Sequence, residues 1–148
     1  MSRGAPLATP GLARRLASLL YESLLLFAVG FAATWLFYFA SGGRGAEGSA
    51  RTLLQVFVVA VFAAYFLWCW LRGGQTLAMK AWRIRLVARD GGSLTPAIAL
   101  ARFVLALLLI IAAAGLGLLW ALFDRERQFL HDRLAGTRLV LLPRRGAR

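Results

Sequence analysis

A long apolar run at residues 16–40 constrains the fold of this chain more than any other feature. As an α-helix rising about 1.5 Å per residue, a run of this length crosses the roughly 30 Å hydrocarbon layer of a bilayer. A second run, residues 52–71, is also long enough to cross it. With 60% hydrophobic residues in a chain of 148, the sequence predicts an integral membrane protein with one domain, residues 1–148. The first helix is expected at about residues 12–40 and the second at about 52–71.

The third apolar segment, residues 103–123, lies in a helix expected from about residue 97. Its middle, residues 112–117, is rich in alanine and glycine, which either lets a neighbouring helix approach closely or marks a bend. The segment is long enough for one crossing and too short for two. It therefore either crosses completely or bends and returns as a re-entrant hairpin packed inside protein.

The polar regions, residues 72–96 and 124–148, contain two strand patterns. Residues 83–87 alternate polar and apolar side chains before the turn at Asp90-Gly91, and residues 138–142 are rich in β-formers. Ser93-Leu94 is a further candidate for a returning strand. The predicted fold class is all-α in the membrane, with a small β-hairpin or strand pair as a cap.

The net charge of +12 comes from 18 basic and 6 acidic residues. The basic residues flank the apolar runs and do not form an aromatic-studded surface, so we expect anionic lipid headgroups as the partner and not nucleic acid. Basic residues gather before residue 16 and from 72 to 102, which predicts a multi-pass protein of the inner membrane with a cytoplasmic N-terminus and 72–96 segment. A re-entrant third segment, which we favour, would place the arginine-rich tail on that side too.

Glu22 is the one acid in the first apolar run and lies on the same helix face as Arg15. An ionisable group in the hydrocarbon layer costs at least ~2 to 3 kcal/mol unless it is paired, neutralised or hydrated. Glu22 is therefore a candidate proton or cation site, or half of a structural ion pair.

His131-Asp132 is a candidate proton relay or cation ligand, because histidine titrates near neutral pH and an adjacent acid raises its pKa. The alternative is that the pair caps the following turn. With one histidine and one cysteine, Cys69, in the chain, we expect no transition-metal site, and the sequence contains no nucleophile–base motif. We therefore expect no enzyme activity and no cofactor.

The remaining polar motifs are interpreted as turn and cap chemistry. These residues are Gly74, Gln75, Thr76, Asp90, Gly91, Asp124, Gly136 and Thr137.

Several of these motifs together resemble the RDD family of small membrane proteins, over residues 12–142. The most specific is the His-Asp-x-Leu-Ala-Gly-Thr stretch at residues 131–137. The resemblance implies that Arg15 is the family's arginine and Asp132 its later aspartate, while Glu22 stands where the family usually has aspartate. Met79 and Arg83 stand where many relatives carry lysine and glycine.

Some members of that family are linked with sodium/proton antiport. The resemblance thus implies a monovalent cation/proton transporter or antiporter subunit that uses Glu22. The alternative is a non-catalytic accessory or scaffold subunit. Because two or three helices enclose no pathway, we expect a homo-oligomer or a complex with another membrane protein. If the tail is cytoplasmic, Glu22 should share a charge cluster with Arg15, Asp132 and an arginine of a loop.

Overall fold

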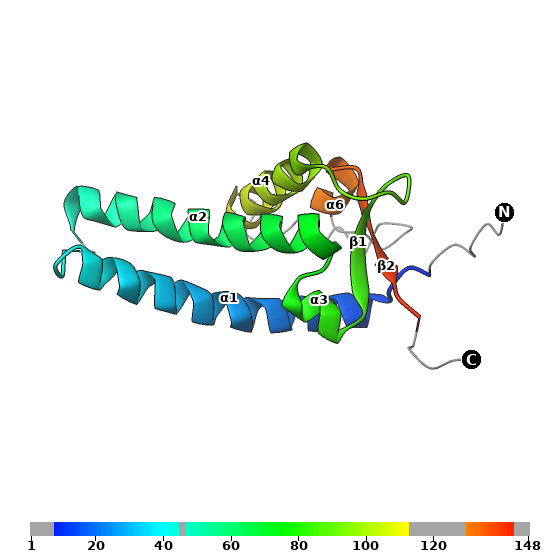
Figure 1. Cartoon of the computed structure of the whole chain (residues 1–148), viewed down its shortest axis with the longest axis horizontal. Coiled ribbons are helices and arrows are strands. Elements are labelled where there is room, and N and C mark those ends of the chain that lie inside the picture. Colours follow the sequence, from blue (N-terminus) through cyan, green and yellow to red (C-terminus); the bar gives the residue numbers. More distant parts are fainter. Residues whose placement is uncertain (1–7, 45–46, 113–129, 144–148) are drawn as a thin grey trace.

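Two long antiparallel helices, α1 (Leu12–Ala40) and α2 (Gly48–Gly73), lie side by side and form most of the length of the protein (Figure 1). The computed structural model describes residues 8–44, 47–112 and 130–143. Among the helices of these segments, α1 and α2 are long and apolar enough to cross a membrane. The predicted all-α membrane fold is confirmed. α2 begins earlier than the expected residue 52, so the connector between the two helices is short.

The polar cap lies at the end of the hairpin where α1 begins and α2 ends (Figure 1). It comprises α3 (Leu77–Ala81), β1 (Ile84–Ala88), α6 (Leu130–Leu134) and β2 (Thr137–Leu141). The strands pair antiparallel, with Ile84 opposite Leu141 and Ala88 opposite Thr137. This confirms the predicted strand pair, with each strand displaced by one residue.

The expected return of the chain as a strand at Ser93-Leu94 is wrong. After β1 the chain turns tightly, with the Gly91 N–H bonded to the Ala88 oxygen at 2.8 Å and the Gly92 N–H bonded to Asp90 Oδ1 at 2.9 Å. Leu94 is then buried in the core just before α4 (Pro96–Ala112). The edge of β1 pairs with β2 instead.

The tail returns to the end of the molecule where the chain starts. α6 packs against α4, β2 pairs with β1, and the Leu141 N–H donates to the Ala8 oxygen at 2.7 Å. This is the placement that the re-entrant alternative requires for the tail. The proposed bend itself lies outside the described residues, apart from Ala112 at its start.

The buried apolar core lies at the junction of the helices with the cap and not along the helix hairpin. It consists of Trp70, Met79, Ile84, Leu86, Leu94, Ala99, Phe103 and Leu139. Farther along the hairpin large apolar side chains are exposed, among them Phe27 at 75% and Phe39 at 69%. An apolar surface of this kind suits lipid, since soluble monomers rarely expose large apolar patches.

Two left-handed residues bracket α3. Gly74 ends α2 with φ +67°, and a Cβ at this position would lie 2.5 Å from the Leu86 oxygen, so the position requires glycine. The close approach of the Gly74 and Leu86 backbones allows a hydrogen bond, in which the Leu86 N–H donates to the Gly74 oxygen at 2.7 Å. Arg83, at the other side, has φ +56°. Glycine adopts a conformation of this kind more readily than arginine does.

Candidate functional site

Glu22 lies in the first half of α1 and is 7% exposed. The Tyr65 hydroxyl on α2 donates to its Oε1 at 2.8 Å, and the Thr76 hydroxyl donates to its Oε2. Both carboxylate oxygens therefore accept hydrogen bonds, and these bonds join α1 to α2 and to the start of α3. Satisfying both oxygens offsets part of the cost of burying the group.

Thr76 is held in place by its neighbours in the turn between α2 and α3. Its Oγ1 accepts a hydrogen bond from the Met79 N–H at 3.2 Å, as the N-cap of α3, so the hydroxyl proton is left to point at Glu22. Gln75 fixes the same turn on β1 through Nε2 to the Ile84 oxygen at 2.6 Å. The Gly74-Gln75-Thr76 motif thus directs one hydroxyl at the carboxylate of α1.

Arg15 lies near the beginning of α1 and is 1% exposed. Its Nε donates to the Pro10 oxygen at 3.0 Å, which ties the guanidinium to the chain just before the helix. Arg15 and Glu22 both line the same cavity. The shared helix face expected from their spacing is thus the face that α1 turns toward the cap.

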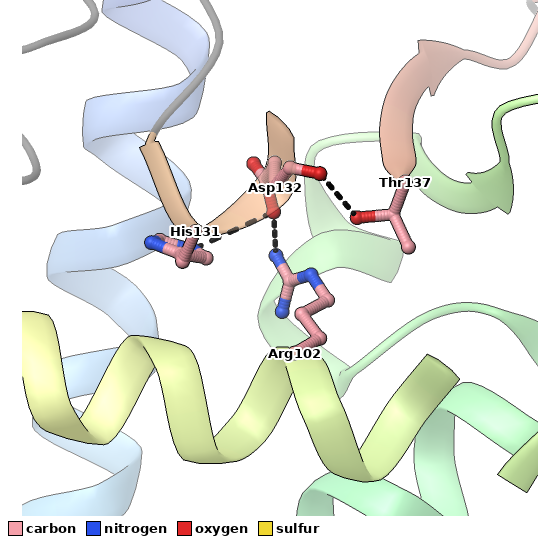
Figure 2. A network of polar contacts seen from close by, with 4 residues as sticks. All are labelled: Arg102, His131, Asp132 and Thr137. Carbon is pink, nitrogen blue, oxygen red and sulfur yellow. Dashed lines mark hydrogen bonds and ion pairs between the residues drawn. The ribbon is translucent and has the colours of Figure 1, made fainter. Parts of the chain in front are cut away.

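Asp132 is fully buried on α6 and forms an ion pair with Arg102 of α4. Arg102 Nη2 lies 2.5 Å from Asp132 Oδ1, and its guanidinium lies over the Trp70 ring, 4.3 Å from the centroid. Thr137, the first residue of β2, donates to the Asp132 backbone oxygen at 3.1 Å. Figure 2 shows Arg102 reaching from α4 to Asp132, with Thr137 and His131 on the two sides of the aspartate. The aspartate thereby connects α4, α6 and β2.

His131 is buried beside this ion pair, with Nε2 3.5 Å from Asp132 Oδ1. Burial lowers the pKa of His131 from 6.5 to about 4, against the opposing effect of Asp132, and the positive charge of Arg102 lowers it further. Asp132 thus acts on the pKa in the expected direction, but desolvation outweighs its attraction and the net change is a decrease. At neutral pH the imidazole is uncharged.

A cavity of about 310 Å³ unites most of these side chains. Arg15, Glu22, Thr76, Arg102 and His131 line it, together with two serines of α1 and apolar residues of α1, α2, α3, α4 and both strands. Asp132 lies behind Arg102 and balances its charge. The arginine that joins the cluster belongs to α4 and not to a loop, which corrects the expectation for that member.

The other predicted turn residues lie apart from the cavity wall. Asp90 and Gly91 form the turn after β1, and Gly136 with Thr137 connects α6 to β2. Asp124 lies outside the described residues. Within the described segments, no group of three or more His, Cys, Asp or Glu side chains is placed to hold a metal ion.

Sequence reasoning missed Tyr65 and Arg102. Tyr65 is a hydroxyl in an apolar span, a signal that is weak because tyrosine is also common at membrane interfaces. Arg102 directly precedes the third apolar segment. A basic residue at the start of an apolar helix is a candidate partner for a buried acid, and this signal could have pointed to Arg102 as the partner of Asp132. In both cases the partner is distant in sequence and only the fold brings it close.

The charged residues of the cavity lie within the part of the chain that a family model matches. The model described as the RDD family matches residues 9–136, which is most of the chain. No curated protein and no solved structure matches the chain. The chain belongs to the RDD family of membrane proteins.

Proposed function

We propose that this protein is a subunit of a monovalent cation/proton transporter, with Glu22 as the group that carries the proton or the cation. The observation that carries the proposal is the position of the carboxylate. It lies on the wall of a cavity and is contacted by two hydroxyl groups from other elements. Hard cations prefer oxygen ligands, carboxylates among them.

The surrounding charges favour the exchange of one cation for another. Arg15 and Arg102 line the same cavity, and positive charges near a carboxylate raise the cost of binding a second cation. A proton and a metal cation would therefore compete for Glu22. Competition of this kind at a single carboxylate is what exchange of a proton for a cation requires.

Transport also needs a pathway across the membrane. Since two or three spanning helices do not enclose one, we infer that the protein acts as a homo-oligomer or with another membrane protein. This role needs neither catalytic chemistry nor a cofactor. The sidedness predicted from basic residues would place the cavity toward the cytoplasm of a cell with the protein in its inner membrane.

Proton flux in proteoliposomes tests the proposal. A pH-sensitive dye inside the vesicles reports proton movement when sodium, potassium or lithium is added outside. We expect cation-dependent flux with the wild type, loss of it with Glu22→Gln, and full flux with Glu47→Gln. Glu47 is a matched control because it is exposed and precedes the first residue of α2, at the end of the hairpin opposite the cap. Flux that is unchanged by Glu22→Gln would remove Glu22 from transport.

One observation favours the second candidate, an accessory or scaffold subunit. Both oxygens of Glu22 already accept hydrogen bonds, while the part of α1 distant from the cap exposes Phe27, Phe31 and Phe39. That surface could pack against helices of a partner. Absence of flux with every cation, together with a membrane protein that co-purifies in fixed ratio, would favour this role.

A further inference from the structure

A second cleft, which shares Trp70 with the charged cavity, lies between the end of α2, β1 and the loop that leads to α4. Its volume is about 240 Å³, which corresponds to roughly eight water molecules at liquid density. The cleft is lined by Trp70, Leu71, Arg72, Gly73, Gly74, Arg85, Leu86, Val87, Gly91, Gly92, Ser93 and Leu94. Among the described residues that line it, Arg72 and Arg85 are charged and none is acidic.

Arg72 lies in the last turn of α2, at the end of an apolar span. Its guanidinium lies 3.8 Å from the centroid of the Trp68 ring, and Trp68 is 60% exposed. Tryptophan at the end of a spanning helix marks the depth of the lipid headgroups. The cation–π contact therefore holds Arg72 at headgroup depth.

Arg85 approaches the cleft from the opposite side. It is an exposed residue of β1, and its Nε donates to the Gly73 oxygen at 3.1 Å. This bond orients the side chain, while the terminal nitrogens of the guanidinium remain as further donors. The two arginines thus reach the cleft from a helix and from a strand.

The carbonyl groups at the end of α2 would by themselves repel an anion. Two of them have donors within the protein, because the Trp70 oxygen accepts from the Gly74 N–H at 2.9 Å and the Gly73 oxygen accepts from Arg85. Asp90, the nearest acid along the loop, accepts the Gly92 N–H. The charge that remains in the cleft is that of the two guanidinium groups.

We propose that this cleft binds the phosphate group of an anionic phospholipid. Arg72 and Arg85 donate to the phosphate oxygens, since a guanidinium binds phosphate through paired N–H groups. The acyl chains lie along α2 beside Trp68 and Leu71, which are exposed next to the cleft at 60% and 42%. This apolar flank is the reason to assign a lipid and not a soluble phosphate.

Native mass spectrometry of the protein in mild detergent tests the proposal. The probes are phosphatidylglycerol and phosphatidylcholine in equal amounts, which differ in net charge but both contain phosphate. We expect the wild type to retain phosphatidylglycerol at least about fivefold more than phosphatidylcholine. Equal retention of the two lipids would overturn the assignment of an anionic lipid site.

The variants locate the site. Arg72→Gln/Arg85→Gln should lose the preference for phosphatidylglycerol, whereas Arg51→Gln, which removes a charge from the beginning of α2, should keep it. Arg72→Lys/Arg85→Lys preserves the charge without the planar donors and should lower retention only a few-fold. Undiminished retention by the double glutamine variant would overturn the site. So would complete displacement of the lipid by millimolar inorganic phosphate, which would make it a site for soluble anions.

Discussion

Arg102 and Asp132 form a buried ion pair, with Nη2 and Oδ1 2.5 Å apart, although the third apolar segment separates them in the chain. Both side chains are removed from water, at 9% and 0% exposure. The pair joins α4 to α6 and sits beside the Glu22 cavity, since Arg102 lines its wall. Each charge is tolerated inside the protein because the other is present.

Removing one member of this pair should therefore cost more stability than removing both. Asp132→Asn leaves the Arg102 charge buried without its counter-ion and should lower the free energy of unfolding by about 3 to 5 kcal/mol. The double variant Arg102→Met/Asp132→Leu should lose much less. Unfolding in mixed micelles with increasing SDS measures both. Equal losses in the single and double variants would show that the pair does not depend on mutual neutralisation.

The hydroxyl groups that contact Glu22 should contribute separately. Tyr65→Phe removes one donor and should cost about 1 to 3 kcal/mol of stability. Thr76→Val removes a donor and also the N-cap of α3, so its loss should be larger by about 1 kcal/mol. Thr76→Ser keeps both bonds and is the matched control. The same SDS titration ranks the variants, and a Thr76→Val loss no larger than that of Thr76→Ser would contradict the hydrogen-bond geometry.

Acidification should destabilise the cap through His131. The pKa of His131 is lowered from 6.5 to about 4, so between these values the unfolded chain binds a proton that the folded chain does not. Stability is complete above pH 6.5 and falls as the pH decreases toward 4, by about 3 kcal/mol in total. Of the neighbouring charges, Asp132 raises the pKa of His131 and Arg102 lowers it.

Unfolding of wild type and His131→Gln between pH 7.5 and 4 isolates this contribution, because carboxylates titrate similarly in both proteins. The stability difference between the two should change with pH and be greatest in favour of the wild type at high pH. A difference that is constant across the range would mean that His131 titrates normally in the folded protein.

Gly74 should tolerate no side chain, whereas its neighbour should. Gly74→Ala places a Cβ 2.5 Å from the Leu86 oxygen in a left-handed residue, which should cost about 2 kcal/mol or more. At Gly73 an added Cβ meets nothing within 4 Å, so Gly73→Ala should be neutral or slightly stabilising. Thermal denaturation in detergent compares them. Similar midpoints would place the requirement for glycine elsewhere in the turn.

The positions of the first helix and of the two strands could be predicted from local sequence patterns. The apolar run after Pro10 and Gly11 predicts α1 with its observed bounds, and alternation at residues 83–87 and β-formers at 138–142 predict the two strands. These signals are local, because helix length and side-chain alternation are set by neighbouring residues. The wrong strand at Ser93-Leu94 was predicted from the same kind of local signal. That signal contains no information that β2, which is distant in sequence, pairs with β1 in its place.

The residues that contact the buried charged groups could not be predicted from local sequence patterns. Tyr65 is 43 residues from Glu22 and Thr76 is 54 residues away. Helical periodicity shows which face Glu22 occupies, but not which residue of another helix meets that face. The pKa of His131 depends similarly on burial, which overrides the effect of the acid beside it in sequence.

The pairing of β1 with β2 has a consequence for the order in which the protein is made. Of the described elements β2 is the last in the chain, so β1 is synthesised before its partner strand exists. During that interval Arg102 has been synthesised but Asp132 has not, and the charged cavity lacks α6 and β2 on one side. The strand pair of the cap can therefore form only after the last described element has been synthesised, because β2 is the strand that pairs with β1.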